Sequence, residues 1–176
     1  MLKRTTLLAL GFAVMMVQGT ANAKTAAELN DLEIAHAAYT ADNIDIRYAH
    51  LALAISTNKA VQEFAATMIR DHVAVNNQAL ALLGKLGAQP QDNFLSQSLQ
   101  KDAEKIIDEM SKLRGAAFDK RYAENDLAYH TAVVGLVEKS FIPNIENAEV
   151  KALFEGGLVI FKAHEDHARK MVKSLK

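Results

Sequence analysis

Four side chains that can ligate a metal ion interrupt otherwise apolar helical stripes in this sequence. They are Asp45, His72, His130 and His164. Apolar residues recur three and four positions away from each of them, which places all four on faces that a helix buries. A buried polar group without a partner costs roughly 1–3 kcal/mol, so each of these residues needs a partner. Three imidazoles and one carboxylate form a ligand set that suits a divalent zinc, copper or iron ion.

A structural polar network is the alternative interpretation. The same side chains can satisfy one another, with help from Tyr48, Tyr129 or a buried water, in a non-catalytic envelope or stress-response protein. The two interpretations differ in their response to acid. Metal affinity must fall as the pH drops below about 6, because a protonated imidazole cannot ligate. An enzyme is less favoured than either, because the sequence has no paired Glu-x-x-His motif for a di-iron centre and no recognisable nucleophile or phosphate loop.

Long amphipathic segments must position these residues. Hydrophobic periodicity predicts four long helices, over residues 25–55, 59–86, 116–141 and 148–175. Asn58 and Asn147 are the expected N-caps of the second and fourth helices. Gly87 is expected to end the second helix and Pro143 the third. Each of the four polar residues lies about 12–17 residues from the nearest connection, so a rise of about 1.5 Å per residue puts all four near mid-height.

A fifth, weaker helical pattern decides the predicted topology. It covers residues 94–113, which as a helix would extend about 30 Å, close to the length of the other helices. A connection of that length can return the chain to the end from which the second helix started. The sequence therefore predicts an all-α, ferritin-like four-helix bundle with a helical crossover between the second and third helices. Residues 24–176 are expected to form this single domain.

The N-terminus has the pattern of a secretory signal peptide. Lys3 and Arg4 precede an apolar run, and Ala21-Asn22-Ala23 is a small-x-small cleavage site. Cleavage after Ala23 would give a periplasmic or secreted protein without a membrane span. Loss of the two basic residues lowers the formal charge from −1 to −3, and this mildly acidic composition argues against nucleic acid as a partner. The sequence leaves a homo-oligomer open and identifies no protein partner.

Several segments resemble a family of ferritin-like, exported bacterial proteins, the domain-of-unknown-function family 4142. The likeness covers Asp31 to Val172 and is carried by "FAATMIRDH" at 64–72, "FDKRY" at 118–122, "YH" at 129–130 and "LVIFKAH" at 158–164. Asp45 stands where that family usually has glutamate, and Val159 where it often has proline. The resemblance implies a ferritin-like fold and export, but it implies no activity, because the family is uncharacterised in function.

Overall fold

Long helices dominate the computed structural model of the protein, which describes residues 24–175. In chain order they are α1 (Asp31–Ile55), α2 (Lys59–Lys85), α3 (Phe94–Ser111), α4 (Gly115–Leu136) and α6 (Ala148–Ser174), with the short η1 (Ala26–Glu28), η2 (Val137–Phe141) and α5 (Ile142–Asn144). The described residues contain no strand, which confirms the all-α prediction. The predicted signal peptide, residues 1–23, lies outside the described residues.

Asparagine side chains begin four of the long helices. Asn58 and Asn147 accept hydrogen bonds from the first free N–H groups of α2 and α6, as predicted. Asn30 and Asn93 do the same for α1 and α3. The first helix therefore starts at Asp31 and not at residue 25, because the chain is still extended at Asn30. Gly87 ends the turn after α2 in the left-handed conformation, with φ +64°.

The predicted third helix is divided near its C-terminus. After α4 the chain forms one π-helical turn, η2, in which the N–H of Ile142 donates to the carbonyl of Val137, five residues back. The short helix α5 then passes through Pro143. Proline has no N–H to donate and its ring collides with the carbonyl four residues earlier. The prediction that Pro143 ends the helix is therefore wrong by one residue, because the wider turn accommodates the ring.

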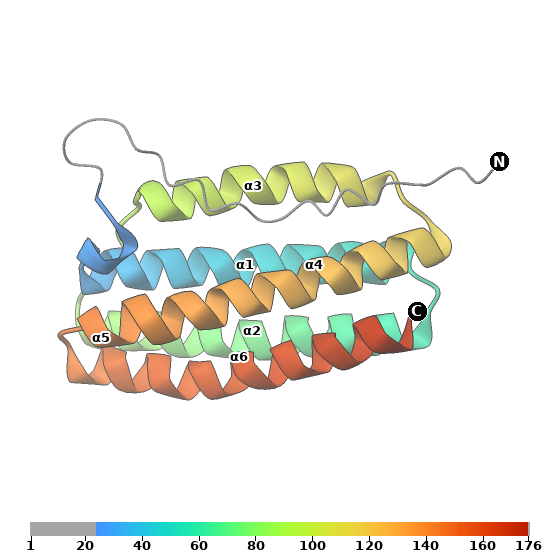
Figure 1. Ribbon diagram of the computed structural model, residues 1–176. Coiled ribbons are helices and arrows are strands. Elements are labelled where there is room, and N and C mark those ends of the chain that lie inside the picture. Colours follow the sequence, from blue (N-terminus) through green and yellow to red (C-terminus); the bar gives the residue numbers. More distant parts are fainter. Residues whose placement is uncertain (1–23, 176) are drawn as a thin grey trace.

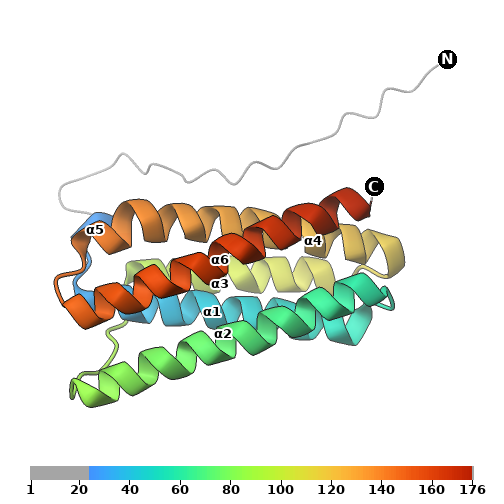
Figure 2. The ribbon, with the colours of Figure 1, turned by 90° about the horizontal axis from the view of Figure 1, so that it is seen from below.

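The long helices pack as two close pairs, α1 with α2 and α4 with α6. The pairs meet through contacts of α2 with α6 and of α1 with α4, while α3 packs on the outer side of α1. Figure 1 shows α3 running along the length of the other helices, so that α2 and α4 run in the same direction. Figure 2 shows α2 and α6 side by side, in opposite directions.

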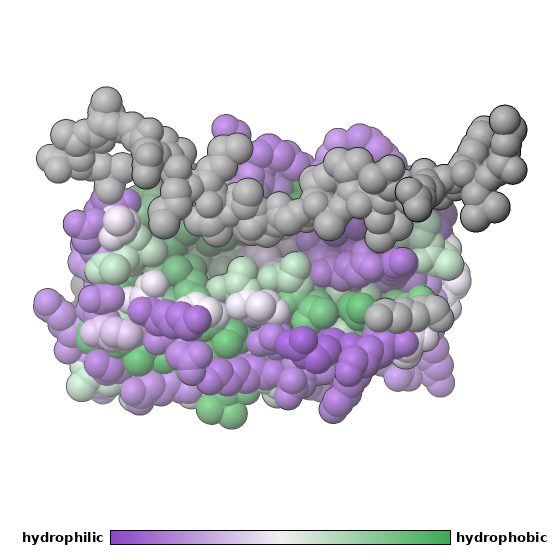
Figure 3. Space-filling view, in the orientation of Figure 1, coloured by the Kyte–Doolittle hydropathy of each residue, from purple (hydrophilic) through white to green (hydrophobic). Residues whose placement is uncertain are grey.

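Two apolar clusters fill the interior at opposite ends. The first, here called the closed cluster, lies around the turn between α1 and α2 and includes Phe64, Met68 and Tyr122. The second, here called the open cluster, lies around η1 and η2 and includes Ile34, Phe141 and Phe154. Hydrophilic side chains cover most of the lower half of the face in Figure 3, over α6. None of the helices in residues 24–175 combines the length and the apolar character needed to cross a membrane.

Candidate metal centre

The four predicted residues come together between the two apolar clusters, one from each helix of the two close pairs. Asp45 projects from α1, His72 from α2, His130 from α4 and His164 from α6, and each is at most 4 % exposed. The ring centroids of the three histidines lie 5.1–5.6 Å apart. The carboxylate of Asp45 is 3.1 Å from Nε2 of His72. One polar layer thus crosses the core.

One nitrogen of each histidine ring is held by an aspartate. Nδ1 of His72 lies 2.7 Å from Oδ1 of Asp42, and Nε2 of His164 lies 3.0 Å from Oδ2 of Asp71. Nδ1 of His130 is 2.9 Å from Oδ1 of Asp126 and 3.1 Å from the backbone carbonyl of the same residue. Carboxylates and carbonyls accept hydrogen bonds, so the imidazole N–H donates to the carboxylates of Asp42 and Asp71 and, in His130, to the backbone carbonyl of Asp126.

The opposite nitrogen of each ring has no well-directed hydrogen bond among residues 24–175, although that of His72 lies 3.1 Å from the carboxylate of Asp45. These atoms are Nε2 of His72, Nε2 of His130 and Nδ1 of His164, and all three are buried. Ligand atoms from the three histidines lie within 4.8 Å of one another. Both carboxylate oxygens of Asp45 are also buried, and neither has a well-directed hydrogen bond within the described chain, although one lies close to His72. The three histidines therefore offer closely spaced ring nitrogens, and the carboxylate of Asp45 lies beside two of them, His72 and His130.

A second grouping shares part of this layer. Ligand atoms of Asp45, Asp126 and His130 also lie within 4.8 Å of one another. Both side-chain oxygens of Asp126 lack a directed hydrogen bond in the part of the chain that the structure describes, as does the hydroxyl of Tyr122. Asp126 is thus both the holder of the His130 ring and a possible oxygen donor beside Asp45.

The carboxylates dominate the electrostatics of the layer. Burial alone would lower the pKa of His72, but the charges of Asp45 and Asp42 outweigh it and raise that pKa to about 10. Burial, reinforced by the charge of Asp45, raises the pKa of Asp126 to about 6. Burial lowers the pKa of His164 to about 4, because its partner Asp71 only partly compensates. His164 is therefore a neutral imidazole at neutral pH, while His72 is a cation.

The layer contains more buried acid than fixed positive charge. Asp42, Asp45 and Asp126 are each at most 5 % exposed. Their only ion-pair partners within residues 24–175 are His72 and His130. A buried charge is tolerated only when it is paired or coordinates a metal ion. Either protons on the histidines or a bound cation must therefore balance these carboxylates.

Sequence reasoning missed the partners of the histidines. Asp126 precedes His130 by four residues and Asp42 precedes Asp45 by three, spacings that place each pair on one helix face. Those spacings could have identified Asp126 and Asp42 as partners from the sequence. No spacing identifies Asp71 as the partner of His164, because Asp71 neighbours His72 in sequence and contacts a histidine on another helix, α6.

The fold and the buried layer define an all-helical protein with a cluster of His and Asp side chains that can hold a metal ion. The chain belongs to the family described as Domain of unknown function (DUF4142), whose family model matches residues 16–171. No curated protein and no solved structure shows significant similarity to the chain.

Proposed function

We propose that this protein binds one divalent metal ion within the polar layer. The ligands are Nε2 of His72, Nε2 of His130, Nδ1 of His164 and a carboxylate oxygen of Asp45. The observation that carries the proposal is shared by the three histidines: each has one ring nitrogen beside an aspartate and the other buried without a well-directed hydrogen bond. In His72 that second nitrogen lies 3.1 Å from Asp45, the fourth proposed ligand. Metal-binding histidines are oriented in this way, because the held nitrogen fixes the tautomer and the direction of the ring.

The ligand chemistry suits zinc, copper or iron. A tetrahedral ion with metal–nitrogen bonds of about 2.0–2.1 Å needs donor atoms roughly 3.3 Å apart. Nitrogens that already lie within 4.8 Å of one another can reach that spacing by small side-chain rotations. Four protein ligands close the coordination sphere, as in structural metal sites. The proposed role is therefore metal binding and not catalysis, and the ion would balance the buried carboxylates.

The proposal extends to topology and location. We infer that α1, α2, α4 and α6 are the four helices of a ferritin-like bundle, with α3 as the crossover. The supporting observations are the contacts among these helices and the parallel directions of α2 and α4 in Figure 1. We also infer that the chain is exported and cleaved after Ala23, giving a periplasmic or secreted protein. Mass spectrometry of the protein recovered from the periplasm should then find an N-terminus at Lys24.

A metal-free polar layer is the second candidate, and one observation favours it. The raised pKa of His72, at about 10, means that a proton on this ring can balance Asp42 and Asp45 at neutral pH. The layer would then be a structural network in an envelope or stress-response protein. Such a network fixes the packing of the helices without binding an ion.

Metal analysis of untagged protein separates the two candidates. The mature chain is purified without a histidine tag, treated with a chelator and titrated with zinc or copper while thermal unfolding is followed. The proposal expects about one ion per chain and a melting temperature that rises with metal concentration, because a ligand that binds only the folded state stabilises it. If the layer is only a structural network, the melting temperature should not rise with metal concentration.

A matched pair of variants completes the experiment. His164→Ala removes a proposed ligand, and His50→Ala removes an exposed histidine from α1. His164→Ala should weaken binding by more than the roughly 10–100-fold typical of losing a partner outside the coordination sphere. His50→Ala should leave binding unchanged. Equal metal binding by both variants would refute the ligand assignment.

A further inference from the structure

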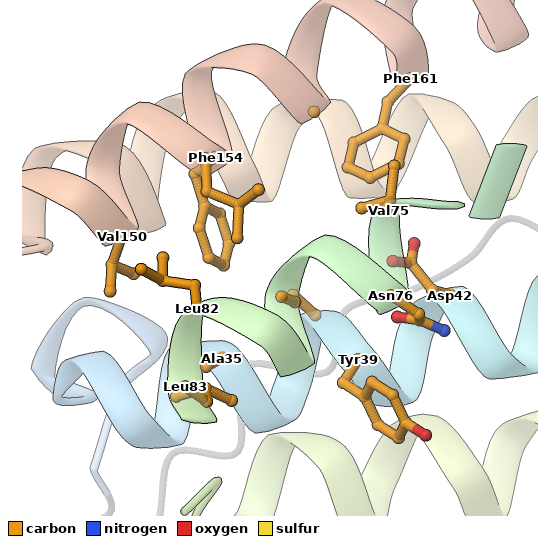
Figure 4. A pocket seen from close by; sticks show the side chains of 14 residues that line it. Ala35, Tyr39, Asp42, Val75, Asn76, Leu82, Leu83, Val150, Phe154 and Phe161 are labelled. Carbon is orange, nitrogen blue, oxygen red and sulfur yellow. The ribbon is translucent and has the colours of Figure 1, made fainter. Parts of the chain in front are cut away.

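A small cavity lies beside the polar layer, between α1, the C-terminal half of α2 and the N-terminal half of α6. Its volume is about 40 Å³. Most of its wall is aliphatic or aromatic and includes Ala79, Leu82, Phe154 and Phe161 (Figure 4). A water could be held only where polar side chains line the cavity, because a buried water needs two to four polar partners. The cavity is therefore suited to a molecule with an apolar body.

The polar groups gather at one end of this cavity. Asn76 and Asp42 lie side by side there, close to Phe161 (Figure 4). The side-chain carbonyl oxygen of Asn76 is buried and has no hydrogen-bond partner among residues 24–175, and the residue is only 5 % exposed. Asp42 already accepts a hydrogen bond from His72. Asn76 is thus an unused acceptor facing an apolar space, and it needs one donor.

We propose that this cavity binds a small neutral molecule with an apolar body and one hydroxyl group, of the class of short-chain alcohols. The hydroxyl donates to Oδ1 of Asn76, and the alkyl part packs against Ala79 and Phe154. A volume of about 40 Å³ is far below the roughly 150 Å³ that accommodates benzene, which limits the body to a few heavy atoms. The neighbouring carboxylate of Asp42 disfavours an anion.

Such a ligand would lie next to the polar layer. Phe161 contributes to the cavity wall and stacks on the ring of His72, with centroids 5.5 Å apart and planes at 13°. Asp42 contributes to the same wall and accepts a hydrogen bond from Nδ1 of that ring. Occupancy of the cavity should therefore affect His72. Any effect of the alcohol on metal binding through His72 rests on the proposed function. Alcohol binding itself does not, so it is tested on metal-free protein.

Two probes of equal size test the hydrogen bond. Metal-free mature protein is titrated with 2-propanol, which has a donor, and with acetone, which has none, while backbone amide signals are followed by NMR. We expect saturable shifts at residues that line the cavity, with a dissociation constant in the millimolar range. Acetone should bind about threefold to tenfold more weakly, the effect of one hydrogen bond. Shifts that stay linear in concentration, or equal affinity for both probes, would overturn the proposal.

Two matched pairs of variants locate the site. Asn76→Leu should remove the preference for 2-propanol over acetone, whereas Asn77→Leu on the exposed side of α2 should keep it. Ala79→Leu should fill the cavity and abolish binding of both probes, whereas Ala74→Leu, also on an exposed position of α2, should not. If Asn76→Leu does not fold, Ala79→Leu remains a sufficient test. Unchanged 2-propanol binding by Ala79→Leu would overturn the assignment even if metal binding is established.

Discussion

The two halves of α2, before and after His72, have very different surroundings. In the first half Val61, Phe64, Ala65 and Met68 are completely buried in the closed cluster. In the second half the buried residues are Asn76 and Leu83 alone. The fully buried members of the open cluster include no residue of α2. One helix thus closes the core at one end of the molecule and leaves a cavity at the other.

This difference assigns different roles to the two ends. Dense packing around Phe64 contributes stability, because this ring is fully buried among the apolar side chains of the closed cluster. The wall around Phe154 has an empty side, so its residues lose part of their attractive contacts. The polar layer lies between the two ends and shares Asp42 with the cavity. We infer that stability resides mainly in the closed cluster and ligand binding in the layer and the open end.

The largest expected effect comes from comparing the same truncation at the two ends. Phe64→Ala should cost about 3–5 kcal/mol of the free energy of unfolding, as for other fully buried phenylalanines. Phe154→Ala should cost less, about 3 kcal/mol or below, because its ring already borders a cavity. The two rings are 0 % and 8 % exposed, so burial alone predicts nearly equal costs. Urea unfolding measures both, and equal losses would contradict the inferred difference between the ends.

A second comparison concerns the aspartates that hold the histidines. Asp42→Asn should weaken metal binding about 10–100-fold, because a partner outside the coordination sphere fixes the ligand and raises its basicity. Asp71→Asn should cost less, because the Asp71 side chain is 25 % exposed and is shared with Arg70. Competition with a chelating dye at pH 7.5 measures both constants. A greater loss of metal affinity for Asp71→Asn would show that the partner on the exposed side of the layer contributes more to metal binding than the partner on the cavity side.

The contribution of the polar layer to stability should depend on pH, whereas the contribution of the apolar clusters should not. The folded-state pKa of His72 is raised to about 10, so its proton stabilises the metal-free protein fully below about pH 6.5. That contribution is lost as the pH rises through 10. A metal ion must displace the same proton, so the metal-induced rise in melting temperature should increase from pH 6 to pH 9. Calorimetric binding at pH 7.5 should release at least one proton, because Asp126 and Asp45 raise the pKa of the ligand His130 as well, against the effect of burial. Heats independent of the buffer's ionisation enthalpy would contradict this.

The sequence predicted the residues of the layer better than their partners. Periodicity along each helix is a local property, so it placed Asp45 and His164 on buried faces correctly. The contact between Asp71 and His164 depends on the rotation and offset of two helices, which no local pattern records. The cavity could not be predicted from the sequence either, because it depends on how completely α6 covers the second half of α2.

The smallest expected effect uses two adjacent glycines of α6 to probe the cavity wall. A methyl group added at Gly157 would lie 3.5 Å from the ring of Phe161, an ordinary contact, and one added at Gly156 would have no such neighbour within 4 Å. Alanine is favoured over glycine inside a helix by about 1 kcal/mol, so both substitutions should stabilise the protein. Gly157→Ala should gain up to about 0.8 kcal/mol more, because its methyl group is buried against the cavity. Thermal unfolding of the two variants isolates that difference. A smaller gain for Gly157→Ala than for Gly156→Ala would mean that the wall has no room, and the contrast between an open and a closed end of α2 would then fail.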